Sequence, residues 1–197
     1  LAGYMVEEED PGYGLICRDD FAMFDAAQHL DRVASRHIGL HVSSGQIRFN
    51  LQRLWNPRTE KGLLSTLRKG AMVRQVADAI EEADKLFGHV ETACDAVHNK
   101  SPRRQRDWSE LRIRESDLVE DTVSLPLQRV RESLGELIET SEDEEASAEL
   151  IECNRRIGEI REAVSTFIGQ SAEKHVYWVE RTGRQGQALA LNAAPID

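Results

Sequence analysis

A single aspartate stands where an acidic side chain could hold a metal-bound nucleotide. The apolar run from Phe21 to Phe24 ends in Asp25, and a helical pattern begins directly after it. In proteins that hydrolyse nucleotides, a carboxylate at the carboxyl end of a buried strand holds Mg²⁺ on the phosphates. An ordinary buried strand that leads into a helix would show the same pattern. The residues alone leave both interpretations open.

Two segments concentrate positive charge beside aromatic residues. Residues 48–74 hold seven Lys and Arg against the single acid Glu60, and residues 100–114 hold six against two acids. Cations with an aromatic can follow a single nucleic-acid strand through phosphate contacts and base stacking. The predicted DNA-binding residues are Arg103, Arg104, Arg106 and Trp108 in the second segment, and Arg48, Arg53, Arg58 and Lys61 in the first. The alternative is a solvated loop with Trp108 packed among the helices.

The composition is that of a folded domain. Hydrophobic residues make up 40% and charged residues 30% of the 197, which excludes a disordered chain. The net charge of −10 argues against a general nucleic-acid binder, so any phosphate-binding surface must be local. No apolar run approaches the roughly 20 residues of a membrane span. The chain starts without Met or a signal-peptide pattern, so we expect a piece of a larger polypeptide.

The cysteines and histidines are not spaced as metal ligands. Cys17, Cys94 and Cys153 lie far apart and are odd in number, which disfavours a disulfide framework and fits a reducing cytoplasm. His37 and His41 are four residues apart, but Gly39 lies between them at an expected helix end. The sequence therefore predicts no metal site.

Long amphipathic helices account for the middle of the chain. Between Val73 and Val97 apolar residues recur at alternating spacings of three and four, which is a heptad pattern. Patterns of this kind predict helices over residues 71–98, 117–139 and 142–170, and a shorter helix from Ser43 or Ser44 to Trp55. Short connections predict antiparallel packing, and Ser141, with an acid three residues on, is the expected cap of the last helix.

Strands are expected at both ends of this helical part. After Gly169 the apolar period changes to two around Tyr177, and residues 182–186 supply a turn, which predicts a β-hairpin. The chain thus divides into a leading loop, strand and helix, a helical insertion, and a returning hairpin, over residues 1–40, 41–172 and 173–197.

Several segments resemble a family of DNA helicases. Residues 25–28, Asp-Ala-Ala-Gln, resemble the D-E-A-H box of the DinG/XPD family of superfamily 2, and Leu30-Asp31-Arg32-Val33-Ala34 resembles its H-L-E-D-V-A continuation. Residues 48–58 and 62–64 resemble the entry into the family's arch insertion. Residues 175–184 and 189–197 resemble the return into the first motor domain. The resemblance covers most of residues 21–197 and is strongest at the two ends.

The resemblance implies a mainly α fold, an arch of long antiparallel helices flanked by small β elements of a RecA-like motor domain. The parent would unwind DNA in the 5′→3′ direction with ATP and Mg²⁺, and the arch would help to enclose single-stranded DNA. The iron–sulfur cluster of the family, where the parent has one, would lie outside this chain. Its partners would be that DNA and the remainder of the motor domains. Asp25 would hold the Mg-nucleotide only in an intact parent, because Ala26 and Gln28 replace the family's Glu and His. The chain has no phosphate loop, so it is expected to have no catalytic residue and no cofactor of its own.

A second function belongs to another class. The chain could be a helical protein-interaction module of a catalytically dead helicase-like protein, docking through acidic faces such as residues 142–145. A free-standing coiled coil is the third alternative, and it is hard to reconcile with the strand and aspartate near the start.

Overall fold

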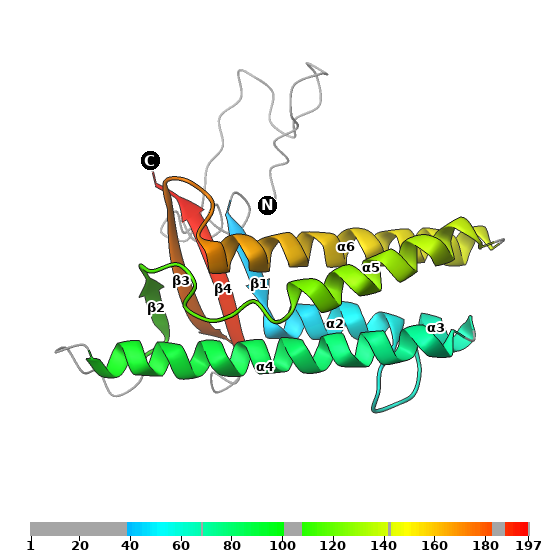
Figure 1. Ribbon diagram of the computed structural model, residues 1–197, viewed down its shortest axis with the longest axis horizontal. Coiled ribbons are helices and arrows are strands. Elements are labelled where there is room, and N and C mark those ends of the chain that lie inside the picture. Colours follow the sequence, from blue (N-terminus) through cyan, green and yellow to red (C-terminus); the bar gives the residue numbers. More distant parts are fainter. Residues whose placement is uncertain (1–38, 68, 101–107, 142, 183–187, 197) are drawn as a thin grey trace, which may run out of the picture. The chain divides into compact units, whose positions relative to one another are not determined.

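Helices dominate the part of the chain that the computed structural model describes, residues 39–67, 69–100, 108–141, 143–182 and 188–196 (Figure 1). The described elements are β1 (Leu40–Ser43), α2 (Ser44–Leu54), α3 (Leu63–Thr66), α4 (Gly70–Lys100), β2 (Glu110–Ile113), α5 (Ser124–Glu139), α6 (Glu144–Gly169), β3 (His175–Thr182) and β4 (Ala188–Pro195). The prediction of a mainly α chain with small β elements is confirmed at this level.

The four strands form one antiparallel sheet in the order β1-β4-β3-β2. The β3–β4 hairpin was predicted from its alternating pattern, and that prediction is confirmed. Strand β1 lies directly beside β4, with Leu40 opposite Ala193. The helices lie in the chain between β1 and β3, with β2 between α4 and α5, and the first and last described strands are neighbours in the sheet.

The two edge strands were not predicted. Strand β2 lies in a stretch read as a loop that leads into a helix starting near residue 117, whereas α5 begins only at Ser124. Both β1 and β2 are four residues long, and they exist because they pair with β4 and β3. Such short strands carry little local signal, since their stability comes from cross-strand neighbours.

The helix starts follow side-chain capping. Ser43 caps α2, and its hydroxyl accepts a hydrogen bond from the Gln46 N–H at 3.2 Å, as predicted. Helix α6 is capped by Asp143, whose carboxylate accepts from two backbone N–H groups at 3.0 and 3.1 Å. The prediction of Ser141 as this cap was wrong. A carboxylate is the stronger acceptor, and it also suits the positive end of the helix dipole.

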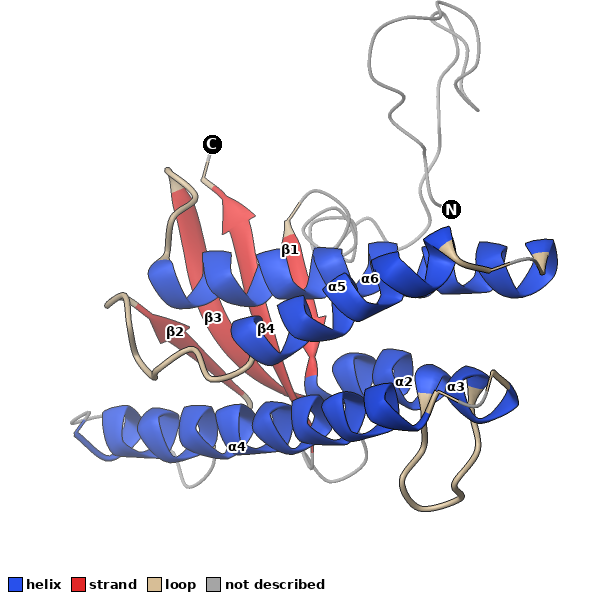
Figure 2. Ribbon diagram, turned by 45° about the vertical axis from the view of Figure 1, so that its right-hand side comes forward, coloured by secondary structure: helices blue, strands red, loops and turns tan. Residues whose placement is uncertain are grey.

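The core lies where the apolar stripes of the helices meet the sheet. In α5 the apolar residues Leu127, Val130, Leu134 and Leu137 recur at helical spacing and are all buried. Helices α4 and α6 lie on the same face of the sheet (Figure 2). The Phe167 ring of α6 meets the Tyr177 ring of β3 edge-on, with centroids 5.8 Å apart. Within the described residues, this face of the sheet is the one that the helices cover.

Candidate nucleic-acid interface

Part of the predicted site lies outside the described residues. This applies to Asp25, Ala26 and Gln28 of the degenerate box, and to Arg103, Arg104 and Arg106 of the second basic segment. Two other residues of that segment are described: Lys100 ends α4, and Trp108 lies just before β2. Trp108 and the four candidates of the first segment can be placed directly.

Two cations of the first segment are used inside the fold. Arg48 of α2 pairs with Asp84 of α4 at 2.5 Å, and Arg53 of α2 pairs with Glu149 of α6 at 3.0 Å. The hydrogen bond that Arg53 donates to Glu149 also raises the pKa of Arg53. Each pair neutralises a charge that the linear sequence presents as available. Both guanidinium groups are therefore weaker phosphate ligands than their position in a basic segment suggests.

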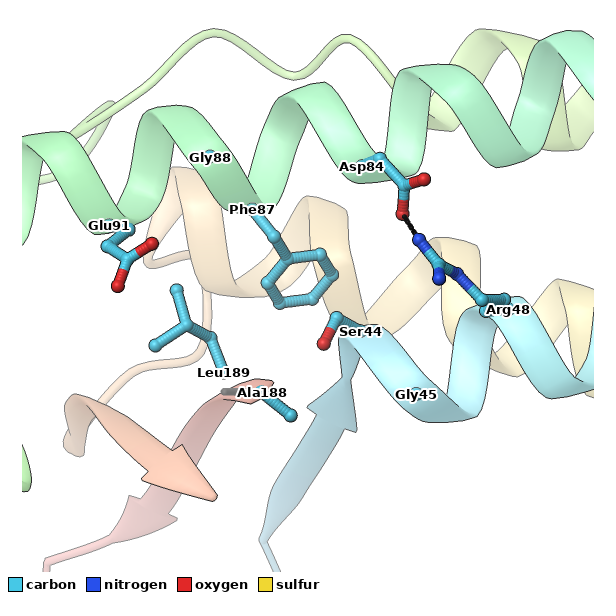
Figure 3. A pocket seen from close by; sticks show the side chains of 9 residues that line it. All are labelled: Ser44, Gly45, Arg48, Asp84, Phe87, Gly88, Glu91, Ala188 and Leu189. Carbon is cyan, nitrogen blue, oxygen red and sulfur yellow. Dashed lines mark hydrogen bonds and ion pairs between the residues drawn. The ribbon is translucent and has the colours of Figure 1, made fainter. Parts of the chain in front are cut away.

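The Arg48–Asp84 pair stands at one side of a cavity of about 500 Å³ between α2, α4 and β4 (Figure 3). Phe87 points into this cavity from α4, and Leu189 and Glu91 lie across it (Figure 3). Its cation already has a carboxylate partner, and Glu91 adds a second acid. This cavity is therefore a poor site for a phosphate.

A tight loop presents the other two candidate DNA-binding residues of the first segment. Arg58 and Lys61 are exposed in the connection from α2 to α3. The Asn56 side chain accepts the Arg58 N–H at 3.0 Å, and its backbone N–H donates to the Lys61 carbonyl at 2.8 Å. Gly62 closes the loop at φ 148°, where a Cβ would lie 2.3 Å from the carbonyl oxygen of Leu54. Only glycine fits there, so the loop holds both cations in solvent.

Trp108 is a structural residue in this fold. Its side chain is only 5% exposed, and its indole N–H donates to the Asp95 carboxylate at 2.7 Å. The Arg181 guanidinium lies over the ring, 4.1 Å from the centroid, and donates to Glu91 and Asp95 at 3.1 Å each. Of the two alternatives for Trp108, packing within the fold matches its position. The stacking role proposed from sequence is corrected accordingly, because Arg181 occupies the ring face that a base would need.

This cluster fixes β2 and β3 to α4. Trp108 precedes β2, Arg181 belongs to β3, and Asp95 belongs to α4. Cys94 lies beside Asp95 and is fully buried, and this burial raises the pKa of its thiol to about 12. A thiol of that pKa is inert near neutral pH. The cluster therefore has a structural role, holding β2 and β3 against α4, and its thiol is not reactive.

A groove of about 480 Å³ runs between the last turn of α4 and β2. Its apolar part consists of Leu111 and Leu118, which are half-buried, and Val97, which is 41% exposed. Its polar part carries Lys100, Arg112 and Arg114, all of them exposed. We call this site the basic groove. It combines apolar surface with several positive charges, as a channel for a single nucleic-acid strand does.

The cations of the basic groove are free to meet a ligand. Within the described ranges, Lys100, Arg112 and Arg114 form no ion pair. Glu115 is the acid that lines the groove with them, so the local balance is positive although the chain carries −10. This contrasts with Arg48 and Arg53, whose acids lie on neighbouring helices.

Sequence reasoning counted these three cations in the charge of residues 100–114 but did not select them. A signal was present, since Leu111 and Ile113 alternate with Arg112 and Arg114. That alternation is the pattern of a strand with one wet face. Over four residues it is too short to separate from a loop.

The remaining chemistry is limited. Across the residues that the structure describes, no group of three or more His, Cys, Asp or Glu is placed to hold a metal ion. His41 Nδ1 lies 2.7 Å from the Asn192 side-chain oxygen, in a pair that joins β1 to β4. Among these same residues, no helix has both the length and the apolar character for crossing a membrane.

Comparisons with known proteins add no family. No model of a known protein family matches the chain, and a search of curated proteins finds no match either. The functional argument therefore rests on the residues themselves and on their arrangement.

Proposed function

We propose that this chain is the arch segment of a DinG/XPD-like ATP-dependent DNA helicase and that it guides single-stranded DNA along its basic groove. The sequence resemblance at both ends supports the helicase part of the proposal. In this proposal the helices form an antiparallel bundle, and the sheet continues into a RecA-like motor domain that the rest of the parent supplies. ATP and Mg²⁺ bind to that parent, with Asp25 as the metal-binding carboxylate.

The topology supports an insertion. The chain leaves the sheet after β1, adds the edge strand β2 between α4 and α5, and returns after α6 in β3 and β4. Strand β4 then pairs with β1 along four residues. An excursion that begins and ends on neighbouring strands can be added to a sheet domain without disturbing its other strands. A free-standing coiled coil needs no such return.

The observation that carries the DNA-guiding role is the basic groove. Its cations form no ion pair with another described residue, and its apolar part lies beside them. Phosphates would contact Lys100, Arg112 and Arg114, while the apolar part would accept the faces of sugars or bases. The neighbouring Arg103, Arg104 and Arg106 lie outside the described residues and remain part of the proposed DNA path.

The test is a fluorescence-anisotropy titration of the chain with an oligothymidylate at several salt concentrations. A single strand releases counterions with a log–log slope of about −0.7 per phosphate contact, so replacing Lys100, Arg112 and Arg114 by Ala together should reduce the slope by roughly 2. The matched control replaces Arg58, Lys61 and Arg74 by Ala. These are also exposed, and they lie toward the other end of α4. Equal losses in the two triple variants, or no loss in the first, would rule out the basic groove.

The helicase part of the proposal has its own test in the full-length parent. Ala26 stands where the family has the glutamate that activates water, and Gln28 where it has histidine. Restoring both, as Ala26→Glu with Gln28→His, should raise ATP hydrolysis by orders of magnitude if residues 25–28 are a degenerate catalytic box. Unchanged hydrolysis would mean that Asp25 only ends a strand.

The alternative, a protein-interaction module with an acidic docking face, has less support. Asp143 is used as a helix cap, and Glu149 is paired with Arg53. Glu152 is paired with Arg155 and Arg156 on its own helix. These acids therefore have internal roles, whereas the cations of the basic groove form no ion pair within the described part of the chain.

A further inference from the structure

Trp178 points to the side of the sheet that the described helices leave uncovered. On β3 its neighbours Tyr177 and Val179 are buried, and Tyr177 meets Phe167 of α6. Successive side chains of a strand point to opposite faces. Trp178 therefore lies on the face opposite the one that α4 and α6 cover.

Trp178 belongs to a row of four residues that crosses the whole sheet. The register places His41, Asn192, Trp178 and Arg112 directly opposite one another on β1, β4, β3 and β2. His41 is half-buried, and from Asn192 to Arg112 exposure increases along this row. Asn192 is 3% exposed, Trp178 is half-buried, and Arg112 is exposed. The row leads from the interior to the basic groove, because Arg112 also lines that groove.

The first two members of the row satisfy each other. His41 Nδ1 lies 2.7 Å from the Asn192 side-chain oxygen, and the Asn192 amide donates to the Ala190 carbonyl at 3.2 Å. The Trp178 indole, in contrast, has no ring contact and no hydrogen bond with another described residue. No described residue thus occupies its N–H or its ring, whereas those of Trp108 are occupied.

Trp178 and Arg112 are close neighbours. The Arg181 N–H donates to the Ser109 carbonyl at 2.8 Å, which makes this a hydrogen-bonded pair of the β2–β3 ladder. The bonded pairs alternate along an antiparallel ladder, so Arg112 and Trp178 form a non-bonded pair, in which side chains approach most closely. A base on the indole would place its neighbouring phosphate within reach of Arg112.

We infer that Trp178 is the base-stacking residue of this chain and that Arg112 beside it holds the adjacent phosphate of a single strand. The inference rests on the proposed DNA-guiding function and names the aromatic that this function needs. An indole beside a guanidinium, neither of them paired with a described residue, matches the chemistry of single-strand binding, in which aromatic rings stack on bases of any sequence. An anionic single strand also complements Lys100 and Arg114 in the adjoining groove.

The direct test uses tryptophan fluorescence. A stacked base quenches an indole, and the Trp55→Phe variant retains only the buried Trp108 and Trp178. We expect oligothymidylate to quench this variant with the same Kd as the anisotropy titration. The Trp55→Phe/Trp178→Phe variant should lose the quenching and still bind, because phenylalanine also stacks. Equal quenching in both variants would overturn the inference.

Affinity provides the second measurement. Trp178→Ala should weaken binding about 5- to 150-fold, the range for one stacked base, with an unchanged salt slope. Trp178→Phe should recover most of this loss. Full affinity in Trp178→Ala, with the salt slope intact, would remove Trp178 from the DNA path and leave the proposed function standing. Absence of salt-dependent binding by the unmodified chain would instead defeat the proposed function itself.

Discussion

The two basic segments of this chain differ in what their charges face. Along α2, Arg48 and Arg53 reach acids on α4 and α6 and form ion pairs. At the far end of α4, Lys100, Arg112 and Arg114 surround a groove and pair with no described residue. The first segment carries the larger net charge in the sequence, yet two of its cations are neutralised by acids on neighbouring helices, whereas the three described cations of the second segment are not. A count of charge along a sequence therefore overstates the ligand-binding capacity of helices that pack against acidic neighbours.

The two tryptophans Trp108 and Trp178 also differ from what their positions in the sequence suggest. Trp108 follows the arginine-rich run directly, and this made it the natural stacking candidate. In the fold it is the anchor of β2, whereas Trp178, 70 residues later, stands beside Arg112. Proximity in sequence to a basic run and proximity in space to its cations are different properties.

The largest expected effect is on stability, at the end of α4. Trp108→Ala removes a buried indole, its hydrogen bond to Asp95, and the surface on which Arg181 lies. We expect a loss of about 3–5 kcal/mol in the free energy of unfolding, as for other buried aromatics. Urea denaturation measures it. Trp178→Ala is the matched control and should cost clearly less, so equal losses would cancel the distinction between the two tryptophans.

The loop between α2 and α3 should be sensitive at one glycine. Gly62→Ala places a Cβ against the Leu54 carbonyl and forces φ 148° on a side chain, so we expect a loss of about 1–3 kcal/mol. Gly45→Ala, in the first turn of α2, meets nothing within 4 Å. It should be neutral or stabilising by up to about 1 kcal/mol. Thermal melting of both variants tests this, and a harmless Gly62→Ala would show that the loop adapts.

Neutralising Asp84 and Glu149, the acids that pair with the first basic segment, should make that segment contribute to DNA binding as the second does. Asp84→Asn with Glu149→Gln frees Arg48 and Arg53, and the salt slope for oligothymidylate should become steeper by up to about 1.4 if both then contact phosphate. Stability should fall by only about 0.2–1 kcal/mol per pair, since both pairs are largely exposed. Glu81→Gln is the control, because Glu81 pairs with Lys85 on its own helix. An unchanged slope in the double variant would mean that α2 lies away from the DNA for reasons other than its ion pairs.

The smallest effect concerns pH. Hydrogen bonds from Arg155 and Arg156 lower the pKa of Glu152 from 4.5 to about 2. A lowered pKa means that the ionised carboxylate favours the folded state, so this contribution is complete above about pH 4.5 and is lost as the pH falls toward about 2. The melting temperature of Glu152→Gln should therefore lie slightly below that of the unmodified chain near neutral pH and converge with it in acid. If the melting temperatures still differ at the lowest pH, the difference arises from packing and not from the charge of Glu152.

The sequence by itself determined the helical part of this protein. The apolar stripes of α4, α5 and α6 are periodic over many turns, and most of the predicted positions are buried. The Ser43 cap and the β3–β4 hairpin were also readable, because a cap and an alternating strand pattern are local signals. The helicase resemblance likewise came from sequence, and it stays a proposal.

Only the tertiary structure decided the edge strands and the site. Strand β2 forms because β3 is beside it, and its formation places Arg112 next to Trp178 and Lys100 near Arg114. The pairing of Arg48 with Asp84 and of Arg53 with Glu149 joins residues 36 and 96 positions apart. Contacts between such distant positions have no periodic signature in one sequence, because they depend on which surfaces the packed helices and sheet bring together.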